Sequence, residues 1–184
     1  AAHAVIAGTG TILADDAALT ARDAAGALLP TQPVPVVVGT RAVPPHAAVR
    51  AHPREPIFLP GPDLRVVLAE LYGRGIQSVF VEGGPTLASA FIREGLADEL
   101  LVYTAPMLLG GPRGARTDIG VDTITDAHRL CISEVQRVGD DLLIIASPAD
   151  AAASRSGTAS APSPSAPSPS APSPSEVTPN EGHD

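Results

Sequence analysis

Short apolar runs alternate along this chain with amphipathic segments, a pattern typical of strands interleaved with helices over a largely parallel sheet. The expected strands cover residues 4–7, 34–38, 56–59, 78–81, 100–104, 131–136 and 142–146. Two helices are expected, over 63–71 with Asp63 as its cap and over 85–93 with Pro85 in its first turn. The apolar positions expected to face the sheet are Val66, Val67, Leu68 and Leu71 in the first helix, and Leu87, Ala88, Phe91 and Ile92 in the second. The pattern therefore predicts an α/β fold.

The last two expected strands are separated by the sequence VGDD at 138–141, which favours a tight hairpin turn. We therefore expect an antiparallel pair to end the sheet. Before this pair, residues 105–121 are rich in glycine and proline and carry Arg113 and Arg116. We expect a long surface loop there, of the kind that is often functional.

The segment 78–95, SVFVEGGPTLASAFIREG, joins an apolar strand to an amphipathic helix through a glycine pair. Gly83 and Gly84 let the backbone approach a ligand closely, and Thr86 can add a hydroxyl group. The amides and the positive dipole end of such a helix bind phosphate, so a nucleotide or phosphorylated metabolite is the expected ligand. The alternative is a tight strand-to-helix turn without a ligand, because a bare glycine pair is weak evidence.

Composition divides the chain into two parts. Residues 148–184, in which the unit APSPS occurs three times, have too few large apolar side chains to form a core, so we expect a disordered Pro/Ser/Ala-rich tail. Residues 1–147 have the size of one α/β domain. The chain enters its first strand almost at once and has no initiator methionine, from which we expect a fragment of a longer polypeptide.

The formal net charge is −8, and all twelve basic residues are arginines. The absence of lysine excludes a Schiff-base or Walker-type lysine mechanism, so any phosphate would be held by arginine, hydroxyl groups and backbone amides. The acidic balance without basic clusters argues against a nucleic-acid partner. No apolar run approaches the roughly 20 residues of a membrane span, and no signal peptide is evident, so we expect a soluble, cytoplasmic protein without a membrane partner.

The remaining metal- and redox-competent side chains give no sign of a site. Cys131 lies in an alternating apolar–polar run, where we expect a buried small hydrophobe rather than a nucleophile. The five histidines, for which surface or capping roles suffice, lack metal-ligand spacing, so no metal site is expected. They are His3, His46, His52, His128 and His183.

A second glycine motif follows the first strand, GTGTILADDAALTAR at 8–22. Alone it is compatible with a turn, an aspartate helix cap and a solvated arginine. Combined with VEGGPTLASAF at 81–91, APMLLGG at 105–111 and VGDDLLI at 138–144, it resembles the riboflavin-biosynthesis pyrimidine reductase family. These enzymes form the C-terminal half of a bifunctional deaminase/reductase and have a dihydrofolate-reductase-like fold. The similarity covers residues 4 to about 146.

The resemblance implies a three-layer sandwich and NADPH-dependent reduction of 5-amino-6-(5-phosphoribosylamino)uracil, in which the ribosyl group becomes a ribityl chain. It also implies a homodimer and, in the parent protein, an upstream zinc deaminase domain. The zinc signature of that deaminase is absent here, because the chain has one cysteine. Two alternatives remain: a reductase acting on another pterin or pyrimidine, and a catalytically silent fragment that only binds nucleotide or pairs with another subunit.

Site residues follow from matching motifs. The resemblance implies substrate contacts at Leu19, Glu82 and Arg22, the last as a clamp on the substrate phosphate. The implied cofactor contacts are Thr11, Asp15, Gly39, Thr40, Arg41, Gly83, Gly84, Pro85, Thr86, Leu87, Ala88, Ser89 and Ala90. We hypothesise that Arg41 binds the 2′-phosphate of NADPH, the alternative being a solvated loop arginine.

The sequence departs from the family pattern in two places. Met107 stands where the family usually places lysine, and Arg113 or Arg116 could compensate for that charge. The family's reductase domain also has a first strand and helix before the equivalent of Ala4, which contribute to both sites. Without them we expect exposed sheet edges and a chain that is unstable or dependent on a partner.

Overall fold

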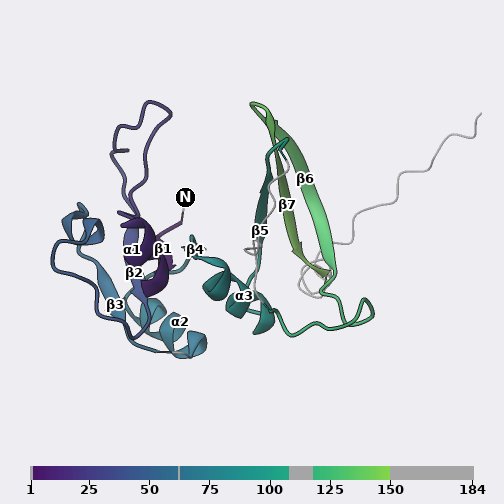
Figure 1. The fold of residues 1–184 in the computed structure, drawn as a ribbon, viewed down its shortest axis with the longest axis horizontal. Helices are drawn as coiled ribbons and strands as arrows, with labels where there is room; N and C mark the ends of the chain where they lie inside the picture. Colours follow the sequence, from purple (N-terminus) through teal and green to yellow (C-terminus); the bar gives the residue numbers. More distant parts are fainter. Residues whose placement is uncertain (1, 62, 108–117, 150–184) are drawn as a thin grey trace, which may run out of the picture.

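The computed structural model describes residues 2–61, 63–107 and 118–149. Its elements along the chain are β1 (Ala4–Gly8), α1 (Thr9–Asp15), β2 (Val34–Val38), η1 (Ala48–Ala51, a 3₁₀ helix), β3 (Ile57–Leu59), α2 (Leu64–Gly73), β4 (Val79–Val81), α3 (Pro85–Arg93), β5 (Leu100–Thr104), β6 (Leu130–Val138) and β7 (Asp141–Pro148). The seven expected strands and the two expected helices are therefore confirmed. Figure 1 shows that the strands form two groups, with α3 between them.

The first group is a parallel sheet with the strand order β3-β2-β1-β4. β1 is central and pairs with β2 over its full length, from Ala4 opposite Val34 to Gly8 opposite Val38. On its other side it pairs with the three residues of β4. Because all four strands run the same way, the loops that follow them meet at one edge of the sheet.

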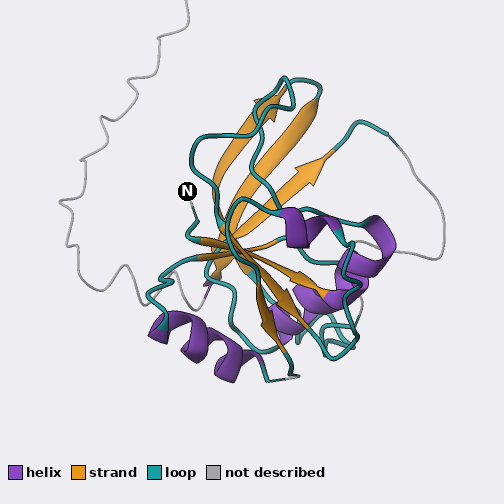
Figure 2. Ribbon diagram, turned by 90° about the vertical axis from the view of Figure 1, so that its left-hand side faces the viewer, coloured by secondary structure: helices purple, strands orange, loops and turns teal. Residues whose placement is uncertain are grey.

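Alternate residues of the central strands pack into two different hydrophobic clusters, one on each face of the sheet. Ala4 and Ile6 contact the cluster that contains Leu71 of α2 and Phe91 of α3. Val5 and Ala7 contact the opposite cluster, which contains Ile12 of α1. Helices therefore cover both faces, as Figure 2 shows, and the expected α/β sandwich of three layers is confirmed.

The helix α2 begins as the sequence predicts. The Asp63 side chain accepts hydrogen bonds from the backbone N–H groups of Arg65 (2.9 Å) and Val66 (3.2 Å), which caps the first turn. Its buried face consists of Leu64, Val67 and Leu71. The prediction that Val66 faces the sheet was wrong, since 61% of this residue is exposed.

The second group of strands is a separate antiparallel sheet with the order β5-β7-β6. The hairpin between β6 and β7 turns through Gly139 and Asp140, and Gly139 has a φ of 64°. This confirms the hairpin predicted from VGDD. The hairpin does not extend the parallel sheet, however. The third strand of the antiparallel sheet, β5, pairs with β7, and the described residues show no pairing between β5 and β4.

Three sequence-based expectations are corrected. Cys131 lies on the edge strand β6, all of whose residues are exposed. The prediction of a buried hydrophobe was therefore wrong. His52 is buried with 8% exposure, because it lies beside η1 and its Nδ1 accepts a hydrogen bond from the Arg54 N–H (2.9 Å). The strand β7 includes Pro148, which was expected to begin the tail. Most of the loop 105–121 and residues 150–184 of the expected tail lie outside the described residues.

Candidate active site at the carboxyl edge of the parallel sheet

A cleft of about 500 Å³ lies where the four parallel strands end. One glycine beyond or at the end of each strand lines it: Gly8 at the end of β1, Gly39 after β2, Gly61 after β3 and Gly84 after β4. Loops at the carboxyl edge of a parallel sheet are the usual ligand-binding position in such folds. Glycines there let a ligand approach the backbone, so the cleft can accept an extended, flat or phosphorylated molecule.

Two of the lining glycines differ in how much room they leave for a side chain. Gly39 has a φ of 140°, and a Cβ atom there would overlap the Thr9 hydroxyl group, so the structure requires glycine at this position. A Cβ atom on Gly84 would come within 3.2 Å of the Thr11 Oγ1 atom, which is a tight contact. The sequence analysis assigned both positions to cofactor binding.

The N-terminal end of α3 faces Thr11 of α1. The Gly84 N–H donates a hydrogen bond to the Thr11 Oγ1 atom (3.0 Å), so this amide is already used. Pro85 has no N–H group, so the Thr86 N–H is the first amide of α3 that is open to a ligand. An anion at this helix end would thus contact the Thr86 amide and the hydroxyl groups of Thr11 and Thr86.

The adjacent carboxylates Asp15 and Asp16 have different roles. Asp16 has a φ of 45°, which ends α1, and its side chain accepts a hydrogen bond from the Ala48 N–H (2.8 Å) at the start of η1. Asp15 belongs to the last turn of α1 and lines the cleft. Asp16 therefore fixes the local fold, while Asp15 is available to a ligand.

Most of the predicted cofactor residues meet in this cleft. Those that line it are Thr11, Asp15, Gly39, Arg41, Gly84, Pro85, Thr86, Leu87 and Ala90. Thr40, Gly83, Ala88 and Ser89 do not line it, and Ser89 is fully buried in α3. Their assignment stays a prediction.

The three predicted substrate residues do not line the cleft. Leu19 is buried in the cluster that contains Ile12. Arg22 lies in the loop that projects from the parallel sheet between α1 and β2 (Figure 1), and its guanidinium group donates hydrogen bonds to the Thr20 hydroxyl group (3.2 Å) and the Gly26 carbonyl group (2.8 Å). Glu82 is exposed, and its N–H continues the sheet by bonding the Ile6 carbonyl group. Their roles also stay predictions.

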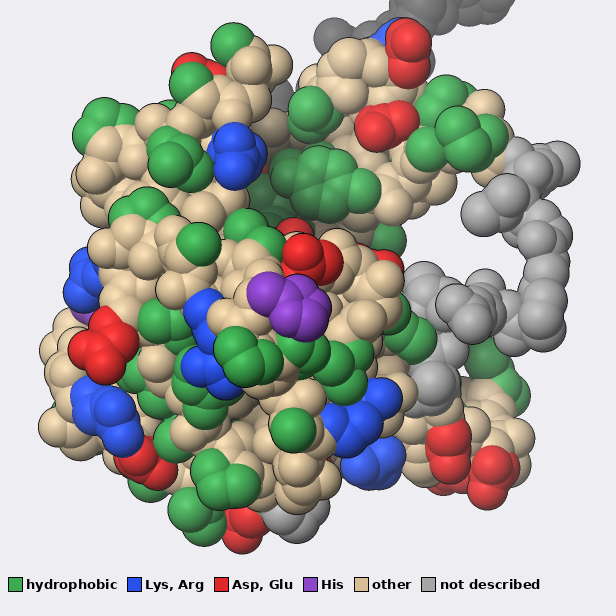
Figure 3. Space-filling model, turned by 60° about the vertical axis from the view of Figure 1, so that its left-hand side comes forward, with side chains coloured by type: hydrophobic (Ala, Val, Ile, Leu, Met, Phe, Trp, Pro, Cys, Tyr) green, Lys and Arg blue, Asp and Glu red, His purple; other side chains and the backbone are tan. Residues whose placement is uncertain are grey.

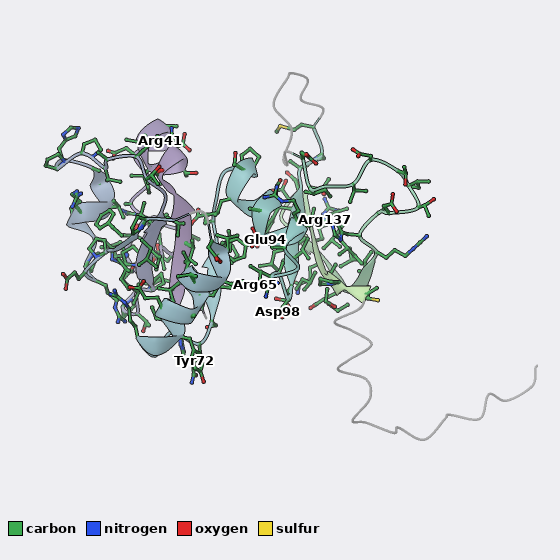
Figure 4. The ribbon with its side chains drawn as sticks, turned by 90° about the horizontal axis from the view of Figure 1, so that it is seen from below. Arg41, Arg65, Tyr72, Glu94, Asp98 and Arg137 are labelled. Atoms are coloured by element: carbon green, nitrogen blue, oxygen red, sulfur yellow. The ribbon has the colours of Figure 1, made fainter. Side chains whose placement is uncertain are left out.

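The cleft has charged residues that the sequence analysis did not assign, Arg93 and Glu94 at the end of α3. An arginine in the last turn of a helix is usually an exposed partner of the helix dipole, so nothing in the sequence marked Arg93 as a lining residue. Arg41 and Glu94 lie well apart in the structure (Figure 4). The charged lining of the cleft thus comes from α1, from the loop after β2 and from the end of α3.

In the face drawn in Figure 3, acidic and basic side chains are interspersed rather than gathered by sign. Within the described ranges, no three His, Cys, Asp or Glu side chains come together in a way that could hold a metal ion. Among the same residues, no helix has the length and apolar character needed to cross a membrane.

Comparison with known proteins identifies the family. The family model described as the RibD C-terminal domain matches residues 1–144. The chain belongs to this family. The riboflavin biosynthesis protein RibD of Mycobacterium tuberculosis (strain H37Rv) is 48% identical over 143 residues, which are 78% of this chain and 42% of that protein. The RibD C-terminal domain thus spans less than half the length of this relative.

Two further relatives of the RibD C-terminal domain bear on its fold and chemistry. A Methanothermobacter thermautotrophicus protein named 2,5-diamino-6-ribosylamino-4(3H)-pyrimidinone 5′-phosphate reductase is 33% identical and matches 77% of either chain. The Acinetobacter baumannii RibD structure, form 1, superimposes with a TM-score of 0.72 and 28% identity, covering 80% of this chain and 47% of that one. The resemblance stated from the motifs is thereby confirmed at the level of the family.

Proposed function

We propose that this RibD C-terminal domain catalyses the NADPH-dependent reduction of 5-amino-6-(5-phosphoribosylamino)uracil to the 5-phosphoribitylamino product. The observation that carries the proposal is the glycine-lined cleft, which gathers most of the predicted cofactor residues at the carboxyl edge of the parallel sheet. The names of the relatives support the same reaction class, since one is called a pyrimidinone 5′-phosphate reductase.

The lining residues fit a dinucleotide. Gly39 and Gly84 line the cleft without a side chain, so a diphosphate can approach the backbone closely there. At the start of α3, the Thr86 amide and the Thr11 hydroxyl group would hold that diphosphate, and Arg41 would meet the 2′-phosphate. When bound, NADPH would supply the hydride that, with one proton, converts the ribosyl carbon into the ribityl CH₂ group.

The protein's contribution would then be orientation rather than covalent catalysis. Holding the cofactor and the substrate in contact can lower a barrier by several kcal/mol. For the substrate phosphate, the proposal assigns Arg22. Since Arg22 lies in a loop outside the cleft, this loop would have to fold over the bound substrate.

The position of the three substrate residues outside the cleft favours a second candidate, a domain that binds the dinucleotide without turnover. Two measurements distinguish the reductase from the domain that only binds: calorimetry measures NADPH binding, and the decrease in NADPH absorbance measures its oxidation. The substrate arms are 5-amino-6-(5-phosphoribosylamino)uracil, the 2,5-diaminopyrimidinone phosphate and dihydrofolate. Binding with oxidation in the first arm supports the main proposal, and oxidation only with dihydrofolate overturns its substrate. Binding without oxidation supports the second candidate, and absence of binding overturns both.

We further propose that the chain forms a homodimer in which β6 pairs with β6 of a second copy. β6 lies at the edge of its sheet, and its nine residues are all exposed. If two copies pair antiparallel about the point between Val135 and Gln136, the Glu134 of each copy lies opposite Arg137 of the other. Opposite charges in this position stabilise strand pairing. Sedimentation analysis of the full chain tests the proposal, and a monomer at all concentrations would contradict it.

A further inference from the structure

Arg50 of η1 ties the loop between β2 and η1 to the rest of the domain. Its Nε atom donates a hydrogen bond to the Pro44 carbonyl group (2.9 Å), and its Nη2 atom donates one to the Val43 carbonyl group (3.0 Å). The two bonds use one edge of a single guanidinium group. They fix the middle of the loop relative to η1.

The same guanidinium group also contacts the sheet. Its central carbon lies 4.6 Å from the centroid of the Phe58 ring on β3, within the range of a cation–π interaction. η1 is held from the other side, where the Asp16 carboxylate accepts the Ala48 N–H. A planar, forked cation can bond two carbonyl groups while stacking on a ring, whereas a lysine ammonium group cannot reproduce this arrangement.

The loop that Arg50 holds, residues 39–47, contains Arg41. Arg41 lines the large cleft, and with Arg50 and Phe58 it also lines an adjoining cavity of about 200 Å³. No carboxylate lines that smaller cavity, so its charged lining is two arginines. The Nη2 atom of Arg41 packs so closely against Gly10 that a Cβ atom there would lie 2.5 Å away. The Arg41 side chain is exposed, and its guanidinium group rests against Gly10 of α1, two residues before the part of the loop that Arg50 holds.

We propose that Arg50 is a positioning residue for cofactor choice: by holding the loop, it keeps Arg41 where it can bind the phosphate group that distinguishes NADPH from NADH. The inference rests on the proposed function, because it takes Arg41 as the residue that meets this phosphate. The Nε and Nη2 atoms of Arg50 donate to carbonyl groups of the loop that contains Arg41, so the proposed effect of Arg50 passes through Arg41, and the double-mutant cycle below separates it from direct contact with the ligand.

The test is a double-mutant cycle on the full chain, with the ratio of NADPH to NADH affinity as the readout. The variants are Arg50→Lys, Arg41→Ala and the double variant, and calorimetry measures both cofactors for each. Arg50→Lys keeps the charge but loses the fork. Arg74→Lys is the matched control, since Arg74 pairs with Glu70 on α2, and neither residue lines either cavity. Because the readout is a ratio, a change in the folded fraction of a variant cancels.

We expect Arg50→Lys to lower the NADPH/NADH affinity ratio about fivefold to tenfold, as for the loss of one or two ordinary hydrogen bonds, and Arg74→Lys to leave it unchanged. In the Arg41→Ala background, Arg50→Lys should change the ratio no further, because the two residues act as one unit. An unchanged ratio in Arg50→Lys, an equal loss for both cofactors, or additive effects in the double variant would overturn the inference. If the unmodified chain bound neither cofactor, the proposed function itself would fail, which is a distinct result.

Discussion

The parallel and antiparallel sheets differ in how far the chain covers their apolar side chains. The parallel sheet has helices on both faces, and Ala4, Ile6 and Val36 in its strands are completely buried. In the antiparallel sheet the buried apolar residues are Leu143 and Ala146, both on the central strand β7. A soluble domain rarely leaves such a surface without a partner. The comparison indicates that most of the buried core belongs to the parallel sheet, and it supports the proposal that the antiparallel sheet contacts a second copy.

The largest expected effect is on the free energy of unfolding, when the same substitution, isoleucine to alanine, is made in each sheet. Ile6 of β1 has 0% exposure and Ile132 of β6 has 62%. Ile6→Ala should lower the free energy of unfolding by about 2–5 kcal/mol, because it leaves a cavity between β1 and the helices. Ile132→Ala should change it by at most about 0.5 kcal/mol. Urea unfolding followed by circular dichroism measures both, and similar losses in the two variants would refute the comparison.

A glycine from each sheet gives the second contrast. Gly39, after β2, combines a φ of 140° with contact to Thr9, whereas Gly139, in the hairpin of the antiparallel sheet, has a φ of 64° and open space around it. Gly39→Ala should cost about 1–3 kcal/mol in unfolding free energy and also weaken NADPH binding, since strain and overlap fall within the cleft. Gly139→Ala should cost about 1 kcal/mol and leave binding unchanged. Equal cofactor affinities in the two variants would show that Gly39 does not border the cofactor site.

The fold could be predicted from the sequence where local signals determine an element, and not where tertiary packing does. Strands and the helices α2 and α3 follow from apolar periodicity and from local signals such as Asp63 and Pro85. The helix α1 was not predicted, because its seven residues include Gly10 and β-branched side chains, which form helices poorly. It forms here because Ile12 packs against the sheet. That packing is a tertiary contact, which no local pattern records.

The candidate site divides in the same way. The predicted cofactor residues include glycines in the loops that follow strands, so Gly39 and Gly84 could be placed in the cleft from sequence. The lining residue Arg93 could not, because whether a helix end faces a cleft depends on how the helix packs. The position of Arg22 depends on the direction of a long loop, which local sequence does not fix.

A smaller effect tests the contact between α1 and α3. Thr11→Val removes the hydroxyl group that accepts the Gly84 N–H. One lost hydrogen bond is worth about 1 kcal/mol, so NADPH affinity should fall roughly fivefold. Thr123→Val is the control, because the Thr123 hydroxyl group bonds Asp126 in a loop outside the cleft. Calorimetry on both variants checks the prediction, and an equal change in the control would assign the effect to general stability.

The smallest effect on the free energy of unfolding is expected on β6, where a substitution should have its clearest effect on association between copies. Val135 lies in the middle of β6 with 57% exposure, and Arg137, labelled in Figure 4, lies on the same edge strand. In dilute solution, Val135→Glu should change the free energy of unfolding by no more than about 0.5 kcal/mol, because the side chain has little packing to lose within one copy. At higher concentration it should prevent the dimer, since it places like charges beside Glu134 of both copies at the proposed strand pair. Sedimentation of the unmodified chain and the variant over a concentration series distinguishes the cases. If both associate equally, β6 is not the contact surface, and the exposed apolar side chains of this sheet require another explanation.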